Sequence, residues 1–442
     1  MKIFMAEQAK ANYQLWSKAK AFFTFWFAIY LFLNIFPWPF TTIHIVYNLF
    51  LPYLQATGYI VNWTGKNILH LTNFGEGIGG FEIGDGIFGY VQLFTFALLS
   101  GIITCFVFLI EKTTKKSSRL YYWMIVYLRY SLAITMLGYG FMKINMDEGQ
   151  FIFPSVATLE QPVGNLSPMG LLWAFMGYSQ PYEIFTGIAE IAGGYLLFFN
   201  RTKALGSLIV IGVMSNVVMM EFSYDVNLKL ISTHLLLISF LILSPDIRRV
   251  IDFFIFHKTI SLSNSVNKFN KKWMRISMAI LKSIIIIGFT GSIINNYRMV
   301  PSAFKSHLYG MYNTERFILN NDTANVSKVD TIVWKKMIID NDYNYTQIIT
   351  KDDSVTYYQA SIDTTKKTLQ LTAYNDTTAK YQFVYSEKPD NYLELSGKWK
   401  GDDVSITFKK KDMQEYPLVS RGFNWINEYP YIGRNIIDNA GH

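Results

Sequence analysis

Three ionisable side chains in long apolar runs could do chemistry inside a membrane. Arg129, Glu190 and His234 each interrupt a stretch of mostly apolar residues. A charged side chain at the bilayer centre costs at least about 2.5 kcal/mol, so such residues usually have a function. Arg129 could hydrogen-bond a carbonyl oxygen of a ligand, while Glu190 and His234 could relay protons. At about 1.5 Å per helical residue, all three lie in or near the middle third of the membrane and could meet.

A structural role is the competing interpretation of these residues. Arg129 and Glu190 would then form a buried ion pair that fixes the register of two helices, with His234 hydrogen-bonded beside them. A second group lies at the external ends of the predicted spans, where its members could rim the mouth of a pocket or act as interfacial anchors. That group consists of Lys143, Asp147, Glu148, Glu221, Asp225 and Lys229.

The composition of the chain is that of a membrane protein. Of its 442 residues, 51% are hydrophobic, 17% aromatic and only 16% charged, whereas soluble domains average about 25% charged residues. The single cysteine excludes an intramolecular disulfide and any metal site built from several cysteines. From Pro301 onward 17 basic residues face 18 acidic ones, so the net charge of +8 comes from the apolar part. We therefore predict a membrane protein with lipids around it, and not a nucleic-acid binder.

Seven segments are apolar and long enough to cross a hydrocarbon core of roughly 30 Å. The predicted spans lie at about 22–40, 88–110, 121–143, 182–199, 204–222, 228–244 and 276–294. If all seven cross, every loop rich in lysine and arginine falls on one side. The positive-inside rule then places the N-terminus in the cytoplasm and residues 295–442 outside. Crossing by Ile43–Val61 would break this parity, so we predict an interfacial or re-entrant helix there.

The region after Tyr297 has the pattern of an exported all-β domain. Its composition shifts to Asp, Asn, Thr, Lys and Tyr, and seven short runs alternate apolar and polar residues between turn clusters such as NDYN and EKPD. This alternation is typical of antiparallel strands, so we predict a sandwich or barrel of about seven strands. The aromatic segment from Arg421 to Arg434 is predicted to cover the barrel's open end or to dock onto a partner or membrane.

Three consecutive stretches between residues 121 and 246 share an order of features with a known family. They are RYSLAITMLGYGFMKI, EIFTGIAEIAGGYLLFFNRTKALGSLIVIGVM and YDVNLKLISTHLLLISFLILSPD. In the family pattern, the first helix ends in a Gly-rich turn that contains Lys. The second helix contains Glu followed by Gly-Gly and leads into a basic loop, after which two further helices follow. On these features the segment resembles the DoxX-like family of four-helix membrane proteins, with matches at Arg129, Lys143, Glu190, Gly194 and Arg201. Some members are membrane subunits of a thiosulfate:quinone oxidoreductase, so the resemblance implies a quinone-linked role.

The predicted fold is a membrane α-helical bundle with a DoxX-like four-helix core, followed by a C-terminal antiparallel β sandwich or barrel. The predicted parts are the first spans and the interfacial segment (1–120), the DoxX-like core (121–246), a basic cytoplasmic loop with the last span (247–299), and the exported β domain (300–442).

No nucleotide, haem or metal motif is evident, and quinone is the only cofactor that the resemblance implies. We expect a multi-pass subunit of a bacterial inner membrane that anchors a periplasmic β domain for a protein partner in the cell envelope. The alternative is a quinone- or lipid-binding membrane subunit of an oxidoreductase, and the sequence leaves open whether any reaction is catalysed.

Overall fold

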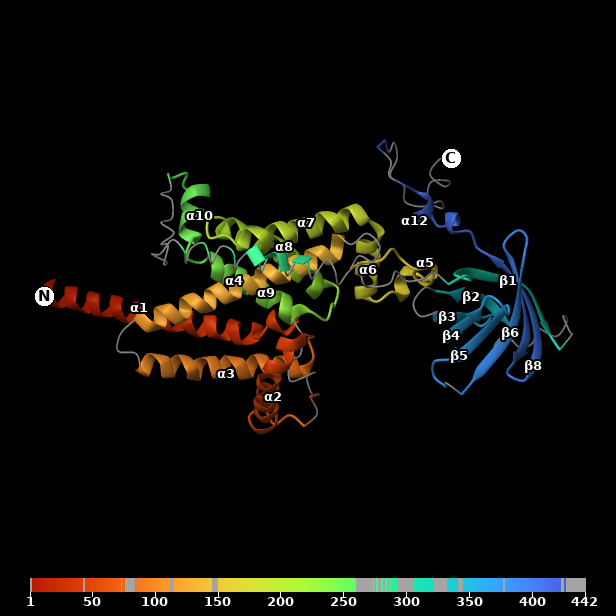
Figure 1. Ribbon diagram of the computed structural model, residues 1–442, viewed down its shortest axis with the longest axis horizontal. Helices are drawn as coiled ribbons and strands as arrows, with labels where there is room; N and C mark the ends of the chain where they lie inside the picture. Colours follow the sequence, from red (N-terminus) through yellow and green to blue (C-terminus); the bar gives the residue numbers. More distant parts are fainter. Residues whose placement is uncertain are drawn as a thin grey trace. The chain divides into compact units, whose positions relative to one another are not determined.

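The computed structural model divides the chain into two compact units (Figure 1), one made of Met1–Gly149 with Pro181–Met299 and the other of Gln150–Gln180 with Val300–His442. Residues 150–180, which the sequence places in the helical core, therefore group with the β domain. The structure describes residues 2–42, 44–72, 74–75, 84–110, 115–144, 150–259, 273, 276, 280, 283–284, 286–288, 290–291, 306–320, 332–340, 345–376, 378–422 and 425–426.

The first unit is a bundle of helices. Its described helices are α1 (Lys2–Ile35), α2 (His44–Asn67), α3 (Ile87–Ile110), α4 (Lys115–Ile144), α7 (Gln180–Leu197), α8 (Lys203–Ser223), α9 (Lys229–Leu243) and α10 (Ile247–Phe254). Helix α1 packs against α3 and α4, and α9 packs against α4 and α8. The core between them is aliphatic, with Leu31, Leu128, Leu137 and Ile238 fully buried.

The outer surface of this bundle is also apolar. Ile102, Phe106 and Leu109 of α3 are largely exposed, as are Phe185 of α7 and Phe222 of α8. A helix that is apolar on every side is typical of a membrane span, because lipid replaces water as its solvent.

Four described helical segments are long and apolar enough to cross a membrane: Lys18–Thr42, Ile87–Ile110, Arg119–Ile144 and Lys203–Ser223. A fifth crossing is obtained if α9 and α10, which are bent by 77°, count as one broken span. The predicted span at 276–294 lies mostly outside the described residues. The predicted segment Ile43–Val61 corresponds to α2, which is not among these candidate spans. The count of seven spans stays a prediction.

The second unit contains a closed barrel of eight antiparallel strands in simple up-and-down order. Its strands are β1 (Gly310–Leu319), β2 (Trp334–Ile339), β3 (Tyr345–Thr350), β4 (Val355–Asp363), β5 (Thr368–Ala373), β6 (Lys380–Lys388), β7 (Tyr392–Trp399) and β8 (Asp402–Lys410). Strand β1 closes the barrel by pairing with both β2 and β8. The prediction of an antiparallel β sandwich or barrel is thus confirmed as a barrel, with eight strands where about seven were predicted.

Inward-facing side chains fill the barrel. Every second residue of β4 to β8 points inward, as the burial pattern shows, and the aromatic residues Trp334, Phe383, Trp399 and Phe408 meet at the centre. Trp334 lies edge-on to Trp399, with ring centroids 4.8 Å apart. Eight-stranded barrels are just wide enough for side chains to fill them, so this interior is a packed core.

Residues 150–180 form two short helices in the same unit. Helix α5 (Val156–Glu160) starts at Ser155 and α6 (Pro168–Tyr178) at Ser167, and each serine side chain accepts a hydrogen bond from a backbone N–H of the first turn. Helix α5 contacts β1 and β2, and Val156 is buried against Met311 and Ile338.

Glu160 fastens helix α5 to the barrel. Its carboxylate accepts hydrogen bonds from Lys336 Nζ at 2.7 Å, Lys411 Nζ at 2.7 Å and Tyr416 Oη at 2.6 Å. Burial raises the pKa of Glu160, but these three donors outweigh it and lower the pKa to about 2. The predicted covering segment Arg421–Arg434 lies mostly outside the described residues.

Candidate functional site

Two buried charges of the helical unit form an ion pair between α4 and α7. Lys143 Nζ donates to Glu190 Oε1 at 2.6 Å, and the side chains are only 9% and 2% exposed. The other carboxylate oxygen, Glu190 Oε2, is buried without a hydrogen-bond partner among the described residues. A buried carboxylate with one unpaired oxygen can accept one further donor from a ligand or a water molecule.

Small residues set the register that places this pair. A Cβ added to Gly140 would lie 2.6 Å from the backbone oxygen of Gly187, and one added to Gly194 would lie 2.9 Å from that of Ala133. These two close contacts run in opposite directions along α4 and α7, so the helices are antiparallel and Glu190 is level with Leu137. The long side chain of Lys143 reaches Glu190 because helical side chains point toward the N-terminus.

The same register keeps Arg129 away from Glu190. Arg129 and Lys143 are 14 residues apart on α4, which corresponds to about 21 Å along the helix axis. Arg129 instead lies near the α7–α8 turn, where its Nη1 donates to Asn200 Oδ1 at 2.5 Å and its guanidinium lies over the Tyr130 ring. The interpretation of Arg129 and Glu190 as an ion pair is therefore corrected, because Lys143 takes the place of Arg129.

His234 of α9 has partners of its own. Its Nδ1 lies 2.6 Å from the carbonyl oxygen of Leu230, and its Nε2 lies 2.8 Å from the hydroxyl of Tyr30 on α1. A carbonyl oxygen only accepts, so Nδ1 carries a proton and Nε2 faces the tyrosine hydroxyl. A hydroxyl can either donate or accept, so this contact is compatible with both protonation states of the imidazole.

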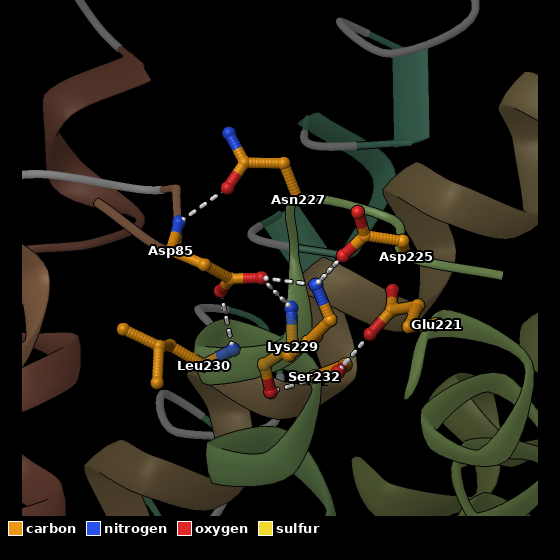
Figure 2. A network of polar contacts seen from close by, with 7 residues as sticks. All are labelled: Asp85, Glu221, Asp225, Asn227, Lys229, Leu230 and Ser232. Atoms are coloured by element: carbon orange, nitrogen blue, oxygen red, sulfur yellow. Dashed lines mark hydrogen bonds and ion pairs between the residues drawn. The ribbon is translucent and has the colours of Figure 1, made fainter. Parts of the chain in front are cut away.

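A network at the start of α9 joins it to the turn before α3 (Figure 2). Asp85 accepts hydrogen bonds from the backbone N–H groups of Lys229 and Leu230, at 3.0 and 2.9 Å, and thereby caps α9 from another part of the chain. The Lys229 ammonium lies between Asp85, at 3.4 Å, and Asp225, at 2.9 Å. The backbone N–H of Asp85 donates to Asn227 Oδ1 at 2.7 Å.

Glu221 connects this network to the buried ion pair. Its carboxylate accepts a hydrogen bond from Ser232 (Figure 2), and Lys143 and Asp85 both act on it electrostatically. One end of the helical unit thus gathers four carboxylates, from Asp85, Glu190, Glu221 and Asp225, around the two ammonium groups of Lys143 and Lys229.

The sequence found most members of this cluster but not their partners. Of the nine predicted site residues, the structure pairs Lys143 with Glu190 and Asp225 with Lys229, places Glu221 against Ser232, and gives Arg129 and His234 separate partners. Sequence reasoning missed Asp85, because its Gly-Asp-Gly turn precedes α3, whereas the helix that Asp85 caps is α9. Asp147 and Glu148 lie outside the described residues.

The chemistry open to the cluster is hydrogen bonding and proton exchange with a polar ligand. Carboxylates near neutral or cationic donors can pass a proton, and the Lys143 ammonium can donate to a carbonyl oxygen. Across the described parts of the chain, no three His, Cys, Asp or Glu side chains are grouped so that they could hold a metal ion.

Comparison with known proteins identifies one relative. No family model matches the chain, and no solved structure matches it. The chain is similar to a protein of Bacillus subtilis (strain 168) described as the uncharacterized protein YwoB, with 30% identity over 126 residues. The alignment covers 28% of this chain and 79% of YwoB. At this identity and coverage, the chain belongs to the same protein family as YwoB.

Proposed function

We propose that this chain is an integral inner-membrane subunit of a bacterial envelope complex, whose helical unit anchors a β-barrel that binds a protein partner. The helical unit supports this role with its candidate spans and its apolar outer surface. The barrel supports it with a surface feature that a purely structural domain does not need, a cluster of three tyrosines of which two are exposed.

The outer surface of the barrel is where we expect a partner to bind. Among the described residues, Trp334, Phe383 and Phe408 fill the interior with fully buried side chains, as in barrels whose core is packed.

The tyrosine cluster consists of Tyr345 on β3, Tyr357 on β4 and Tyr374 just after β5. Tyr345 is stacked on Tyr357, with ring centroids 5.4 Å apart, and lies edge-on to Tyr374 at 5.7 Å. Tyr357 and Tyr374 are 43% and 52% exposed. Exposed tyrosines held by their neighbours lose little entropy on binding, and tyrosine is enriched in the energetic centres of protein interfaces. This cluster is the observation that carries the proposal.

Co-purification tests this function. The full-length protein in nanodiscs is expected to bring a stoichiometric envelope protein with it, and replacing all three tyrosines by alanine should remove that protein. Val384→Ala is the matched control, since Val384 is an exposed residue of β6, and it should leave the partner bound. Isolation of the unaltered protein as a stable monomer without any partner contradicts the proposal.

The membrane topology belongs to the same proposal. We place the N-terminus in the cytoplasm and the barrel in the periplasm, with seven spans and a DoxX-like core at 121–246. The distribution of lysine and arginine supports this orientation. Two contacts support the DoxX-like core. Lys143 and Glu190, which both match the family pattern, form an ion pair with each other. Arg129, a third match, contacts Asn200 in the turn between α7 and α8.

A quinone- or lipid-binding oxidoreductase subunit is the second candidate, and Glu190 favours it. Its buried Oε2 has no partner among the described residues and could accept a hydrogen bond from a quinol hydroxyl, while Lys143 beside it could donate to a quinone carbonyl. Under this alternative, Glu190→Gln should abolish retention of quinone in extracts of the purified protein while the fold persists. If no quinone or isoprenoid accompanies the unaltered protein, this alternative is excluded.

A further inference from the structure

Helix α10 changes direction sharply at the end of α9. The two helices are separated by the turn Ser244–Asp246 and bent by 77°. If α9 crosses the membrane, a bend of this size lays α10 close to the membrane plane.

The bend is fixed by a carboxylate that joins three elements. Asp246 forms ion pairs with Lys203 at the start of α8, at 2.9 Å, and with Arg249 of α10, at 3.3 Å. Its side chain is only 13% exposed. The direction of α10 is therefore set by contacts within the helical unit.

The two faces of α10 differ in chemistry. Ile247, Val250, Ile251 and Phe254 share one face at helical spacing, and the charged residues Arg248, Arg249 and Asp252 lie on the opposite face. Phe254 is 64% exposed, and the following Ile255 and Phe256 are exposed as well. A short helix with this division is typical of a segment that lies in the interface between water and lipid.

We propose that α10 lies on the membrane surface and binds the headgroups of anionic lipids. The alternative of a broken span would put Arg248, Arg249 and Asp252 into the hydrocarbon core, where each costs at least about 2.5 kcal/mol. The apolar face of α10 instead enters the acyl chains, and the basic residues stay at headgroup level. This inference rests on the membrane-spanning role proposed above.

Charge selects anionic over zwitterionic lipid at this site. In the described residues of the α7–α8 turn, the start of α8 and the segment 246–258, the basic side chains are Arg201, Lys203, Arg248, Arg249 and Lys258, against the two carboxylates of Asp246 and Asp252. Asp246 is already paired with Lys203 and Arg249. The side chains of Arg248 and Lys258, in contrast, are 93% and 63% exposed. A cation at the surface of an anionic membrane gains about 1 kcal/mol, so the headgroup preference should be about fivefold for one cation that is free to bind.

Fluorescence quenching by brominated lipids tests this inference in the full-length protein. The single exposed cysteine is first replaced (Cys105→Ser), and Phe254→Cys on the apolar face of α10 is labelled with an environment-sensitive dye. Phe240→Cys in α9 reports on the span, and Arg248→Cys on the polar face of α10. Each labelled protein is placed in vesicles of phosphatidylcholine with phosphatidylglycerol at equal mole fraction, with the bromine on one or the other lipid.

The label at position 254 should be quenched by shallow bromines, and about fivefold more effectively by brominated phosphatidylglycerol than by brominated phosphatidylcholine. That preference should vanish in about 0.5 M NaCl and weaken in Arg248→Gln, which keeps the fold because Arg248 is exposed. The label at position 248 should remain unquenched.

Quenching at position 240 without quenching at 254 overturns this inference but leaves the membrane-spanning role intact. Equal quenching at 254 by both lipids also overturns the anionic selectivity. Lack of quenching at 240 contradicts the crossing of α9 and with it the seven-span topology of the proposed function.

Discussion

The helical unit and the barrel differ in the side chains that cover their outer surfaces and in the charges that they bury. Inside the helical unit lie the ion pair Lys143–Glu190 and the contact of His234 with Tyr30, while phenylalanine and leucine cover its outside. Inside the barrel lie Trp334 and its aromatic neighbours, while lysine, aspartate and threonine cover its outside.

This contrast is compatible with lipid around the helical unit and water around the barrel. In lipid no hydrophobic driving force acts between helices, so close backbone contacts such as Gly140–Gly187 and polar contacts between helices would hold the bundle together. In water the barrel gains its stability from burying apolar surface. Substitutions of the same chemical type should therefore have different effects in the two units.

The largest effect is expected for Trp334→Ala at the centre of the barrel. Trp334 is fully buried and contacts the rings of Trp399, Phe383 and Phe408. The cavity should cost about 4 kcal/mol of barrel stability, seen as early thermal unfolding by near-ultraviolet circular dichroism. Trp425→Ala is the control because Trp425 is 90% exposed, and a comparable loss there would contradict the role of core packing.

The next effect is expected for Lys143→Met in the helical unit. Removing the lysine leaves the Glu190 carboxylate buried without its partner, which should cost about 3 kcal/mol. Adding Glu190→Gln should recover most of that loss, because no buried charge then remains. Thermal unfolding of the protein in nanodiscs measures both variants.

An exposed ion pair of the barrel provides the matched control. Lys335 and Asp353 lie 2.5 Å apart, but their side chains are 46% and 71% exposed. Lys335→Met should therefore cost no more than about 0.5 kcal/mol. If Lys143→Met and Lys335→Met lower the free energy of unfolding by the same amount, the buried and the exposed ion pair contribute equally, and the contrast between the two units does not extend to their ion pairs.

The strands show how far sequence patterns predict this fold. The alternating runs YTQIIT and KTLQLTAYN correspond to β3 and β5, because one face of each strand is buried and the other is exposed. Strand β1 was not predicted because Met311 and Tyr312 are both buried and a bulge between Thr314 and Arg316 shifts the register. A bulge breaks the period of two on which the prediction depends.

The cluster of carboxylates around Lys143 and Lys229, together with His234, shows what the sequence could not predict. The burial of Glu190 and His234 follows from their position in apolar runs, and the structure agrees. The partner of Glu190 depends on the register of α4 and α7, which the glycine contacts decide, and the partner of His234 on another helix depends on the packing of α9 against α1; no periodicity reveals either. Asp85 caps α9 from 144 residues away in the sequence, a distance over which local patterns say nothing.

A smaller effect is expected for Glu160→Gln, which weakens the attachment of α5 to the barrel. Glutamine cannot replace the charged hydrogen bonds to Lys336 and Lys411, so the barrel should lose about 2 kcal/mol at neutral pH. Glu394→Gln is the control, since Glu394 and Lys388 form an exposed pair, and it should change little.

Acid should remove the contribution of Glu160 in the unaltered protein. Its pKa is about 2 in the folded protein and 4.5 ordinarily, so the unfolded chain binds the proton first as the pH falls. The stabilisation is present above about pH 4.5 and is lost as the pH falls toward 2. A Tm difference between the unaltered protein and Glu160→Gln that persists at pH 2 would show that the carboxylate charge is not the cause.

The smallest effect is expected for Asp85→Asn, at the rim where the buried cluster meets the surface. Asp85 accepts from two backbone N–H groups and the Lys229 ammonium, and the neutral amide keeps only one acceptor oxygen. The loss should be about 1 kcal/mol, as for other capping residues, with faster hydrogen exchange at Lys229 and Leu230. Asp225→Asn is the control because Asp225 is 84% exposed, and asparagine tolerates its positive φ of 52°. If Asp225→Asn accelerates exchange as much as Asp85→Asn does, the exposed Asp225 holds Lys229 as firmly as Asp85 does. Asp85 would then not belong to the buried polar cluster around Lys143 and Glu190.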